Sequence, residues 1–132
     1  MAQFSKHFTV QEARATIPEL RKKIIRINDL VAEIKKRAVE SEISGPPIVR
    51  QNGRGPVVDA SGPQREQAQR LLNEIADSGI LIKDLGRGLV DFPHFLNSDP
   101  QREVFLCWHL GEDTIEYWHD IEAGYVGRQK LD

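Results

Sequence analysis

Apolar residues recur along the first third of the chain at alternating intervals of three and four positions. The spacing is kept by Ile17, Leu20, Ile24, Ile27, Val31, Ile34 and Ala38, and Ile25 and Leu30 broaden it. A heptad pattern held over three repeats predicts a long amphipathic helix that packs against another helix, as in a coiled coil. A helix buried on a globular core gives similar spacing over two turns, so that alternative stays open.

Capping signals and one interruption mark the start of this helix. Thr9 and Glu12 form a capping box, in which each side chain can accept the backbone amide of the other residue. Pro18 disfavours helical geometry in the residue before it, and Thr16 with Glu19 makes a second capping box. We therefore expect a short first helix, followed by a kink or a restart at Pro18.

A stretch rich in glycine and proline separates the long helix from a shorter one. This stretch is longer than a compact helix connection needs, which predicts a mobile loop. The second helix shows its apolar face at Ala68, Leu71, Leu72 and Ile75, and Gly79 ends it. The predicted single domain, 1–132, comprises a kinked long helix at 8–42, a mobile loop at 43–62, a second helix at 63–79, and a β-meander with a C-terminal tail at 80–132.

The two helices are expected to form an antiparallel hairpin of unequal arms. At 1.5 Å per residue the long helix spans roughly 35 Å and the second helix roughly 24 Å. The overhang leaves about two turns of the apolar seam uncovered. The same helix of a second chain is the most economical cover. We therefore predict a homodimer, although an apolar seam leaves higher assemblies open.

Beyond Gly79 the pattern changes from helical to extended. It predicts an antiparallel meander of four strands at 80–85, 88–93, 102–110 and 114–120. A four-residue loop after the third strand would place Leu106 opposite His119. One face would then point to the helices and carry Val104, Leu106, Trp108, Leu110, Ile115, Tyr117 and His119. The other face would carry Glu103, Phe105, Cys107, His109, Glu116, Trp118 and Asp120. A slip of one residue would exchange these assignments. The fold class is therefore α+β, with the helical hairpin packed on a small antiparallel β-meander.

Charge is distributed unevenly along the chain. The net charge is -2, yet residues 1–50 carry ten Lys and Arg against six Asp and Glu, whereas residues 80–132 carry five against ten. This asymmetry indicates complementary surfaces within or between chains. A nucleic-acid-binding domain is usually basic overall, so we expect no nucleic-acid partner.

Several features bear on location and redox chemistry. The uninterrupted aliphatic runs are only a few residues long, so no segment is expected to cross a membrane. The first residues lack the apolar core of a secretion signal. The single cysteine, Cys107, falls within a predicted strand, where we expect a small buried apolar residue rather than a nucleophile. We therefore expect a cytoplasmic protein.

The candidate chemistry centres on His119, at the end of an apolar row and three residues before Glu122. Such a histidine can be a buried ring hydrogen-bonded to a carboxylate. Alternatively, Asp91, His119 and Glu122 could hold a divalent metal, with His94 as a fourth ligand, because these groups suit borderline or hard cations. The spacing does not decide between the two interpretations. The common hydrolase, phosphate-loop and paired-cysteine motifs are absent from the sequence.

The C-terminal motifs resemble those of a small prokaryotic family catalogued as a domain of unknown function. They are Lys83-Asp84-Leu85, Arg87-Gly88-Leu89-Val90-Asp91-Phe92-Pro93, Leu106-Cys107-Trp108, Trp118-His119-Asp120, Glu122-Ala123-Gly124 and Gly127-Arg128-Gln129. Phe8–Ala13 and Pro18-Glu19-Leu20 are similar to the opening of that family. The resemblance implies no activity. It draws attention to the polar motif members Asp84, Asp91, His119, Glu122 and Arg128, whereas His94 lies outside the pattern.

Arg87 and Arg128 complete the set of ligand-binding candidates. Both flank glycines, and either guanidinium could hold a carboxylate or phosphate through two hydrogen bonds. Structural ion pairs with Asp84, Asp91 or Glu122 are the alternative. The leading functional hypothesis is a non-enzymatic homodimeric assembly module built on the long helix. The second is a metal- or small-ligand-binding protein that uses the Asp/His/Glu cluster, and it leaves enzymatic activity open.

Overall fold

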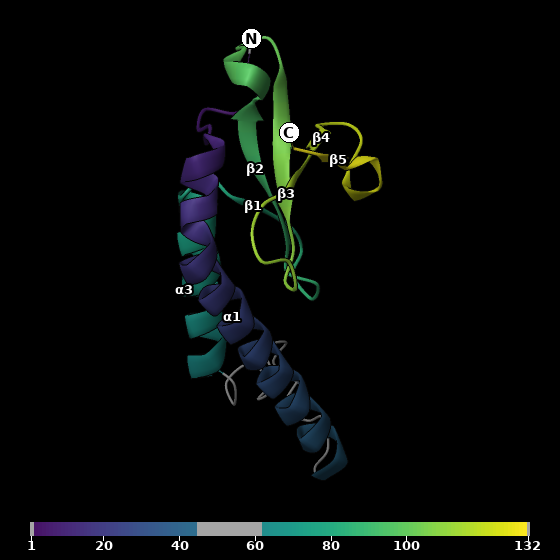
Figure 1. Cartoon of the computed structure of the whole chain (residues 1–132). Coiled ribbons are helices and arrows are strands. Elements are labelled where there is room, and N and C mark those ends of the chain that lie inside the picture. The colour runs from purple at the N-terminus through teal and green to yellow at the C-terminus, as the bar shows by residue number, and fades with distance from the viewer. Residues whose placement is uncertain (1, 45–61, 132) are drawn as a thin grey trace. The chain divides into compact units, whose positions relative to one another are not determined.

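The computed structural model describes residues 2–44 and 62–131, with the side chains of the first helix described as far as Lys36 (Figure 1). The helices are α1, Val10–Ser44, and α3, Gly62–Asp77. The strands are β1, Leu81–Asp84; β2, Leu89–Phe95; β3, Glu103–Trp108; β4, Tyr117–Asp120; and β5, Gln129–Lys130. The short helices η2, Leu96–Ser98, and η3, Tyr125–Gly127, complete the order. Two helices followed by an antiparallel sheet confirm the α+β class. The core of the expected loop at 43–62 lies outside the described residues.

The expected restart at Pro18 is wrong, because α1 runs without interruption through this residue. Thr16 does not cap a new helix; its hydroxyl donates a hydrogen bond to the carbonyl of Ala13 at 2.7 Å. A proline inside a helix costs about 3 kcal/mol. Ile17, Leu20 and Ile24 are all buried, and each contributes roughly 1.5–3 kcal/mol. Burial of this face therefore outweighs the cost of Pro18.

The expected capping box at the start of α1 is confirmed. The Thr9 amide donates to the Glu12 carboxylate at 2.9 Å, and the Glu12 amide donates to the Thr9 hydroxyl at 3.0 Å. These bonds satisfy two of the amides that a helix leaves without partners at its first turn. They fix the position at which the chain enters α1.

The chain divides into two compact units. The first comprises residues 1–24 and 75–132, and the second comprises residues 25–74. In the second unit α1 and α3 lie side by side and antiparallel, and Arg26 donates to the Gln67 side chain at 3.3 Å (Figure 1). Ile27, Leu30 and Ala68 are buried there. None of the helices in the described part of the chain is long and apolar enough to cross a membrane.

The sheet belongs to the first unit and follows the order β1-β2-β3-β4-β5, with each strand antiparallel to its neighbour. The predicted meander is confirmed, and β5 is an additional short strand. The central pair, β2 and β3, is buried along most of its length. One face of this pair packs on the start of α1, because the Phe8 and Phe92 rings lie 5.2 Å apart and Arg21 lies 5.7 Å from the Trp108 ring.

The predicted register between the third and fourth strands is wrong by one residue. Leu106 pairs with Trp118, and His119 pairs with Phe105. The connection is no tight hairpin, because the chain leaves the ladder after Trp108. There the Glu112 carbonyl accepts the Trp108 indole N–H at 3.0 Å, and the Glu112 carboxylate accepts the His109 amide at 3.0 Å. The slip moves Trp118 to the helix-facing side of the sheet and His119 to the opposite side.

Candidate metal centre

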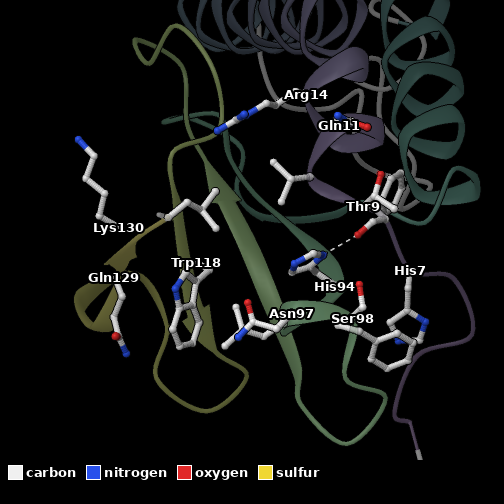
Figure 2. Close-up of a pocket in the computed structure, with 15 residues that line it drawn as sticks. His7, Thr9, Gln11, Arg14, His94, Asn97, Ser98, Trp118, Gln129 and Lys130 are labelled. Carbon is white, nitrogen blue, oxygen red and sulfur yellow. Dashed lines mark hydrogen bonds between the residues drawn. The ribbon is translucent and has the colours of Figure 1, made fainter.

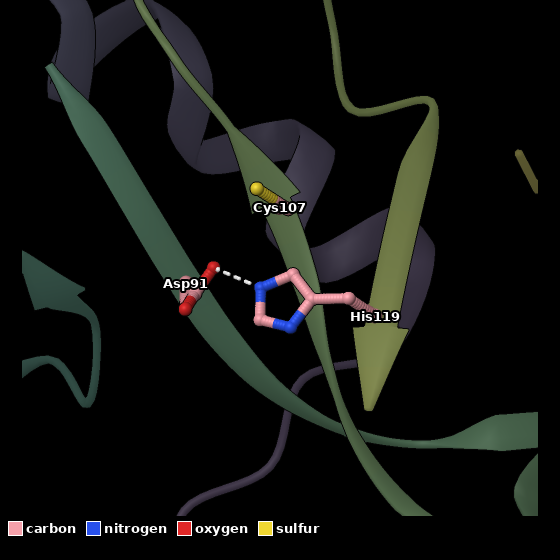
Figure 3. Close-up of side chains that lie close together, drawn as sticks. All are labelled: Asp91, Cys107 and His119. Carbon is pink, nitrogen blue, oxygen red and sulfur yellow. Dashed lines mark hydrogen bonds and ion pairs between the residues drawn. The ribbon is translucent and has the colours of Figure 1, made fainter. Parts of the chain in front are cut away.

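Three neighbouring strands bring Asp91, Cys107 and His119 together on the face of the sheet that points away from α1 (Figure 3). Asp91 in β2 pairs with Cys107 in β3, and His119 in β4 pairs with Phe105. Paired residues share a face, as do residues two apart along a strand. One ligand atom from each of the three residues lies within 4.8 Å of the others, and all three residues are buried.

The His119 ring is held at both nitrogens. Its Nε2 lies 3.0 Å from Asp91 Oδ1, and its Nδ1 lies 2.8 Å from the carbonyl oxygen of Asp120. A carbonyl only accepts hydrogen bonds, so Nδ1 carries a proton and donates it. Nε2 is therefore the atom whose proton can leave, and it points to Asp91.

The electrostatics of the cluster favour a charged ring and a neutral thiol when no metal is bound. Burial alone would lower the pKa of His119, but the hydrogen bonds to Asp91 and Asp120, together with the charge of Asp91, raise it above 6.5. Burial and the negative charge of Asp91 raise the pKa of the Cys107 thiol to about 12. The surroundings of His119 thus favour its protonated form, and those of Cys107 favour the neutral thiol.

A small cavity of about 140 Å³ adjoins the three residues, and Lys83, Ile121 and Tyr125 also line it. It has room for a few water molecules or a small ligand. The Phe105 ring packs on His119, with the two ring centroids 5.6 Å apart. Lys83, which lines the cavity and brings positive charge to it, lies 5.0 Å from the Phe105 ring.

The other predicted site residues lie elsewhere. Glu122 is exposed in the turn after β4 and is outside the convergent set. Asp84 accepts the backbone amide of Arg87 at 3.2 Å in the turn between β1 and β2. The Arg87 guanidinium lies 4.8 Å from the Tyr125 ring. His94 points to the other face of the sheet, where its Nδ1 donates to the Phe8 carbonyl at 2.8 Å.

Arg128 forms an ion pair with a residue that the sequence reasoning did not select. Its guanidinium donates to both carboxylate oxygens of Glu112, at 2.8 and 2.7 Å, and stacks between Tyr117 and Tyr125. Burial alone would lower the pKa of Arg128, but the bonds and charge of Glu112 raise it. The guanidinium is therefore already engaged, which fits the structural interpretation of Arg128.

Cys107 is the member of the cluster that sequence reasoning missed as a ligand. The expectation that it is buried in a strand is confirmed. The sequence pattern placed Cys107 on the same face of the third predicted strand as Glu103 and Phe105. The wrong register between the third and fourth strands, however, assigned His119 to the opposite face. A one-residue correction at β4 would have grouped Cys107 with His119, and the pairing of β2 with β3 would have added Asp91.

Comparison with known proteins supports the resemblance at the level of the family. The family of uncharacterized conserved proteins DUF2203 matches residues 6–131. No curated protein and no solved structure gives a significant match. The chain therefore belongs to the DUF2203 family.

Proposed function

We propose that this DUF2203 member binds a divalent transition-metal ion through Asp91, Cys107 and His119. One observation carries the proposal. Carboxylate, thiol and imidazole atoms from three strands converge within 4.8 Å in a buried position. The mixed oxygen, sulfur and nitrogen set suits Zn²⁺ better than Mg²⁺ or Ca²⁺, which prefer oxygen ligands.

The hydrogen bond from His119 to Asp120 supports this choice of ligands. Metal-binding histidines usually donate their second ring N–H to a carbonyl or carboxylate, which fixes the ring and its tautomer. His119 Nδ1 already makes such a bond at 2.8 Å. Loss of the proton from Nε2 would present its lone pair to an ion beside Asp91.

The charge balance also favours a cation. Binding would release the proton of His119 Nε2 and the proton of the Cys107 thiol, because a metal needs a neutral imidazole and a thiolate. Three protein ligands leave a fourth position for water or a small ligand, as in open zinc sites. The adjoining cavity of about 140 Å³ provides the space for that position.

Metal analysis of purified protein tests the proposal. The protein is prepared without an affinity-tag metal, equilibrated with Zn²⁺, freed of loose ions and analysed by elemental and native mass spectrometry. We expect about one ion per chain, and retention should be lost in Cys107→Ala and His119→Ala. His109→Ala is the matched control, since this histidine also lies near a carboxylate, Glu112, but outside the cluster.

A second readout separates a true ligand set from a structural ion pair. Co²⁺ bound by Cys107 should give a thiolate charge-transfer absorption that Cys107→Ser abolishes, provided that circular dichroism shows the variant to be folded. If wild type and both cluster variants retain equal amounts of metal, the three residues do not bind the ion. The Asp91–His119 pair would then have a structural role only.

A homodimer through α1 is a second proposal, supported by one feature of the second unit. Ile27 and Leu30 are buried, whereas the next seam positions, Val31 and Ile34, keep part of their surface exposed. α1 has 35 residues and α3 has 16, so α3 can cover only part of α1. A second copy of α1 would complete the heptad packing. Sedimentation velocity at micromolar concentration should show a dimer, and a monomer alone would exclude this role.

A further inference from the structure

A second and larger cavity, of about 960 Å³, lies in the first unit on the helix-facing side of the sheet. The start of α1, the end of β2 with η2, and strands β4 and β5 contribute to it (Figure 2). We call it the basic groove and define it by Arg14, His94 and Trp118. Its volume is at the upper end of the range found for small-molecule sites.

The charge on the helix-facing side of the basic groove has one sign. Arg14 lines the groove, and none of the described lining residues is Asp or Glu. Lys130 also borders the cavity, but it pairs with Tyr117, so its side chain leaves the sheet on the opposite face from Trp118. The Arg14 Nε donates to the Ile115 carbonyl at 3.0 Å, which positions the side chain. Its two terminal nitrogens have no acceptor among the described residues, and a guanidinium without a carboxylate partner favours an anionic ligand.

The start of α1 adds to the positive electrostatic potential of the basic groove. Thr9, Val10 and Gln11 line the groove, and the capping box uses only the amides of Thr9 and Glu12. The amides of Val10 and Gln11 are therefore free within the described structure. Free amides at the first turn of a long helix bind phosphate and carboxylate groups.

An aromatic side chain also lines the basic groove. Trp118 is half-buried, and its indole lies beside the cavity in Figure 2. The Nδ1 atom of His94 donates to the Phe8 carbonyl, and this bond fixes the orientation of the ring. The Nε2 atom of His94 has no partner among the described residues. An exposed indole face stacks well on planar rings such as nucleobases.

The backbone of the groove wall is unusual at two adjacent positions. Asn97 and Ser98 in η2 have φ angles of 56° and 61°, in the left-handed region that residues other than glycine seldom occupy. Both residues line the groove. Strained backbone of this kind is enriched at ligand sites, where it directs polar groups toward a ligand.

We propose that the basic groove binds a small phosphorylated ligand with a planar ring, of the nucleotide class. Arg14 and the first turn of α1 hold the phosphate, and the ring stacks on Trp118. The site is separate from the metal centre, because Trp118 and His119 are consecutive in β4 and point to opposite faces of the sheet.

Tryptophan fluorescence can follow binding directly. The chain has two tryptophans, and Trp108 is fully buried, so a ligand in the basic groove should affect the emission of Trp118. Metal-free protein is titrated with adenosine monophosphate, adenosine, inorganic phosphate and a single-stranded oligoadenylate. Heat of binding, measured by calorimetry, gives an independent affinity.

Substitutions separate the phosphate contacts from the ring contact. Arg14→Gln should weaken nucleotide binding about tenfold or more. Lys22→Gln removes the same charge from an exposed position outside the groove and should leave the affinity unchanged. Trp118→Leu should weaken binding of the nucleotide, measured by calorimetry, without changing the weak binding of inorganic phosphate.

Each outcome decides the proposal. Nucleotide binding that is tighter than that of adenosine or phosphate, and that falls in the Arg14 variant, supports it. Absence of binding at millimolar nucleotide overturns it, as does equal loss in the Lys22 control. Inorganic phosphate that binds as tightly as the nucleotide overturns the role of Trp118. An oligonucleotide that binds far more tightly than the mononucleotide would identify a nucleic-acid surface instead and overturn the small-ligand proposal.

Discussion

His119 is a residue whose protonation state should report whether the cluster holds a metal. In metal-free protein its folded-state pKa is raised above 6.5, so the pairing stabilises the fold fully below pH 6.5. This contribution is lost as the pH rises through the folded-state pKa. We expect the free energy of unfolding in chelator, measured by urea titration, to decrease over that interval.

The same titration in saturating Zn²⁺ should show the opposite slope, because metal binding needs the deprotonated ligands and therefore strengthens with pH. His119→Ala should remove the pH dependence and destabilise the metal-free protein by about 3–5 kcal/mol, since it leaves the Asp91 carboxylate buried without its partner. An unchanged slope in His119→Ala would show that another group titrates.

Cys107 shows where residue-scale prediction from sequence ends. Burial in a strand followed from the apolar neighbours of Cys107, and the structure confirms it. Its proximity to Asp91 and His119 depends on strand pairing, which places residues far apart in sequence opposite one another. His119 and Asp91 were selected from their residue types, whereas Glu122 was selected from a three-residue spacing that leaves its side chain exposed in a turn.

At the scale of elements, Glu103 at the start of β3 fixes the N-terminal segment to the sheet. Its carboxylate accepts the amides of Gln3 and Phe4, at 2.7 and 3.1 Å, and contacts His7 Nε2 at 2.6 Å. Burial alone would raise the pKa of Glu103, but these hydrogen bonds lower it below 4.5. The segment then covers the outer face of the sheet, where the Phe4 and Phe105 rings lie 5.3 Å apart.

Glu103→Gln should release this segment. The contribution of Glu103 is present above pH 4.5 and is lost as the pH falls through its lowered folded-state pKa. We expect the variant to lose about 1–2 kcal/mol at neutral pH and to show faster hydrogen exchange at the first residues. Glu116→Gln, at an exposed position, serves as the control. Equal exchange in the two variants would show that the carboxylate does not hold the segment.

The turn between β1 and β2 offers a matched pair of glycines. Gly88 has a φ of +67°, and a Cβ there would collide with the Leu110 side chain, whereas a Cβ at Gly86 would meet only an ordinary contact at 3.6 Å. Gly88→Ala should destabilise the protein by about 2–4 kcal/mol, from backbone strain and overpacking together. Gly86→Ala should be nearly neutral. Urea unfolding of both variants measures the difference, and similar values would contradict the tight packing of the turn.

Element types were predictable from the sequence because local periodicity determines them. The heptad seam and the alternating apolar residues identified both helices and four strands. Two errors had causes outside the local pattern. Pro18 stays within α1 because tertiary burial of Ile17 and Leu20 compensates for it, and the register of β4 follows from the contacts that Glu112 makes at the end of β3.

At the scale of the whole molecule, dimerisation through the heptad seam can be distinguished from nonspecific hydrophobic association. Ile34 lies at a core heptad position of the seam in the second unit, whereas Ile25 lies at the edge of the seam and is 46% exposed. If α1 pairs with its copy, Ile34→Lys should convert the dimer to monomer, because a charge at a core heptad position opposes packing. Ile25→Lys should leave the dimer intact. Sedimentation of both variants, with circular dichroism to verify folding, measures the effect.

The two borders of the sheet have a consequence for behaviour at high concentration. β5 has only two residues and carries Lys130, while β1 has four residues, an irregular register between Ile82 and Asp84, and exposed Lys83 and Asp84 at its end. Edge strands that are short, charged and irregular offer few unpaired backbone N–H and C=O groups to a strand of another chain. The protein should therefore resist strand-to-strand aggregation even though β2 and β3 are strongly apolar.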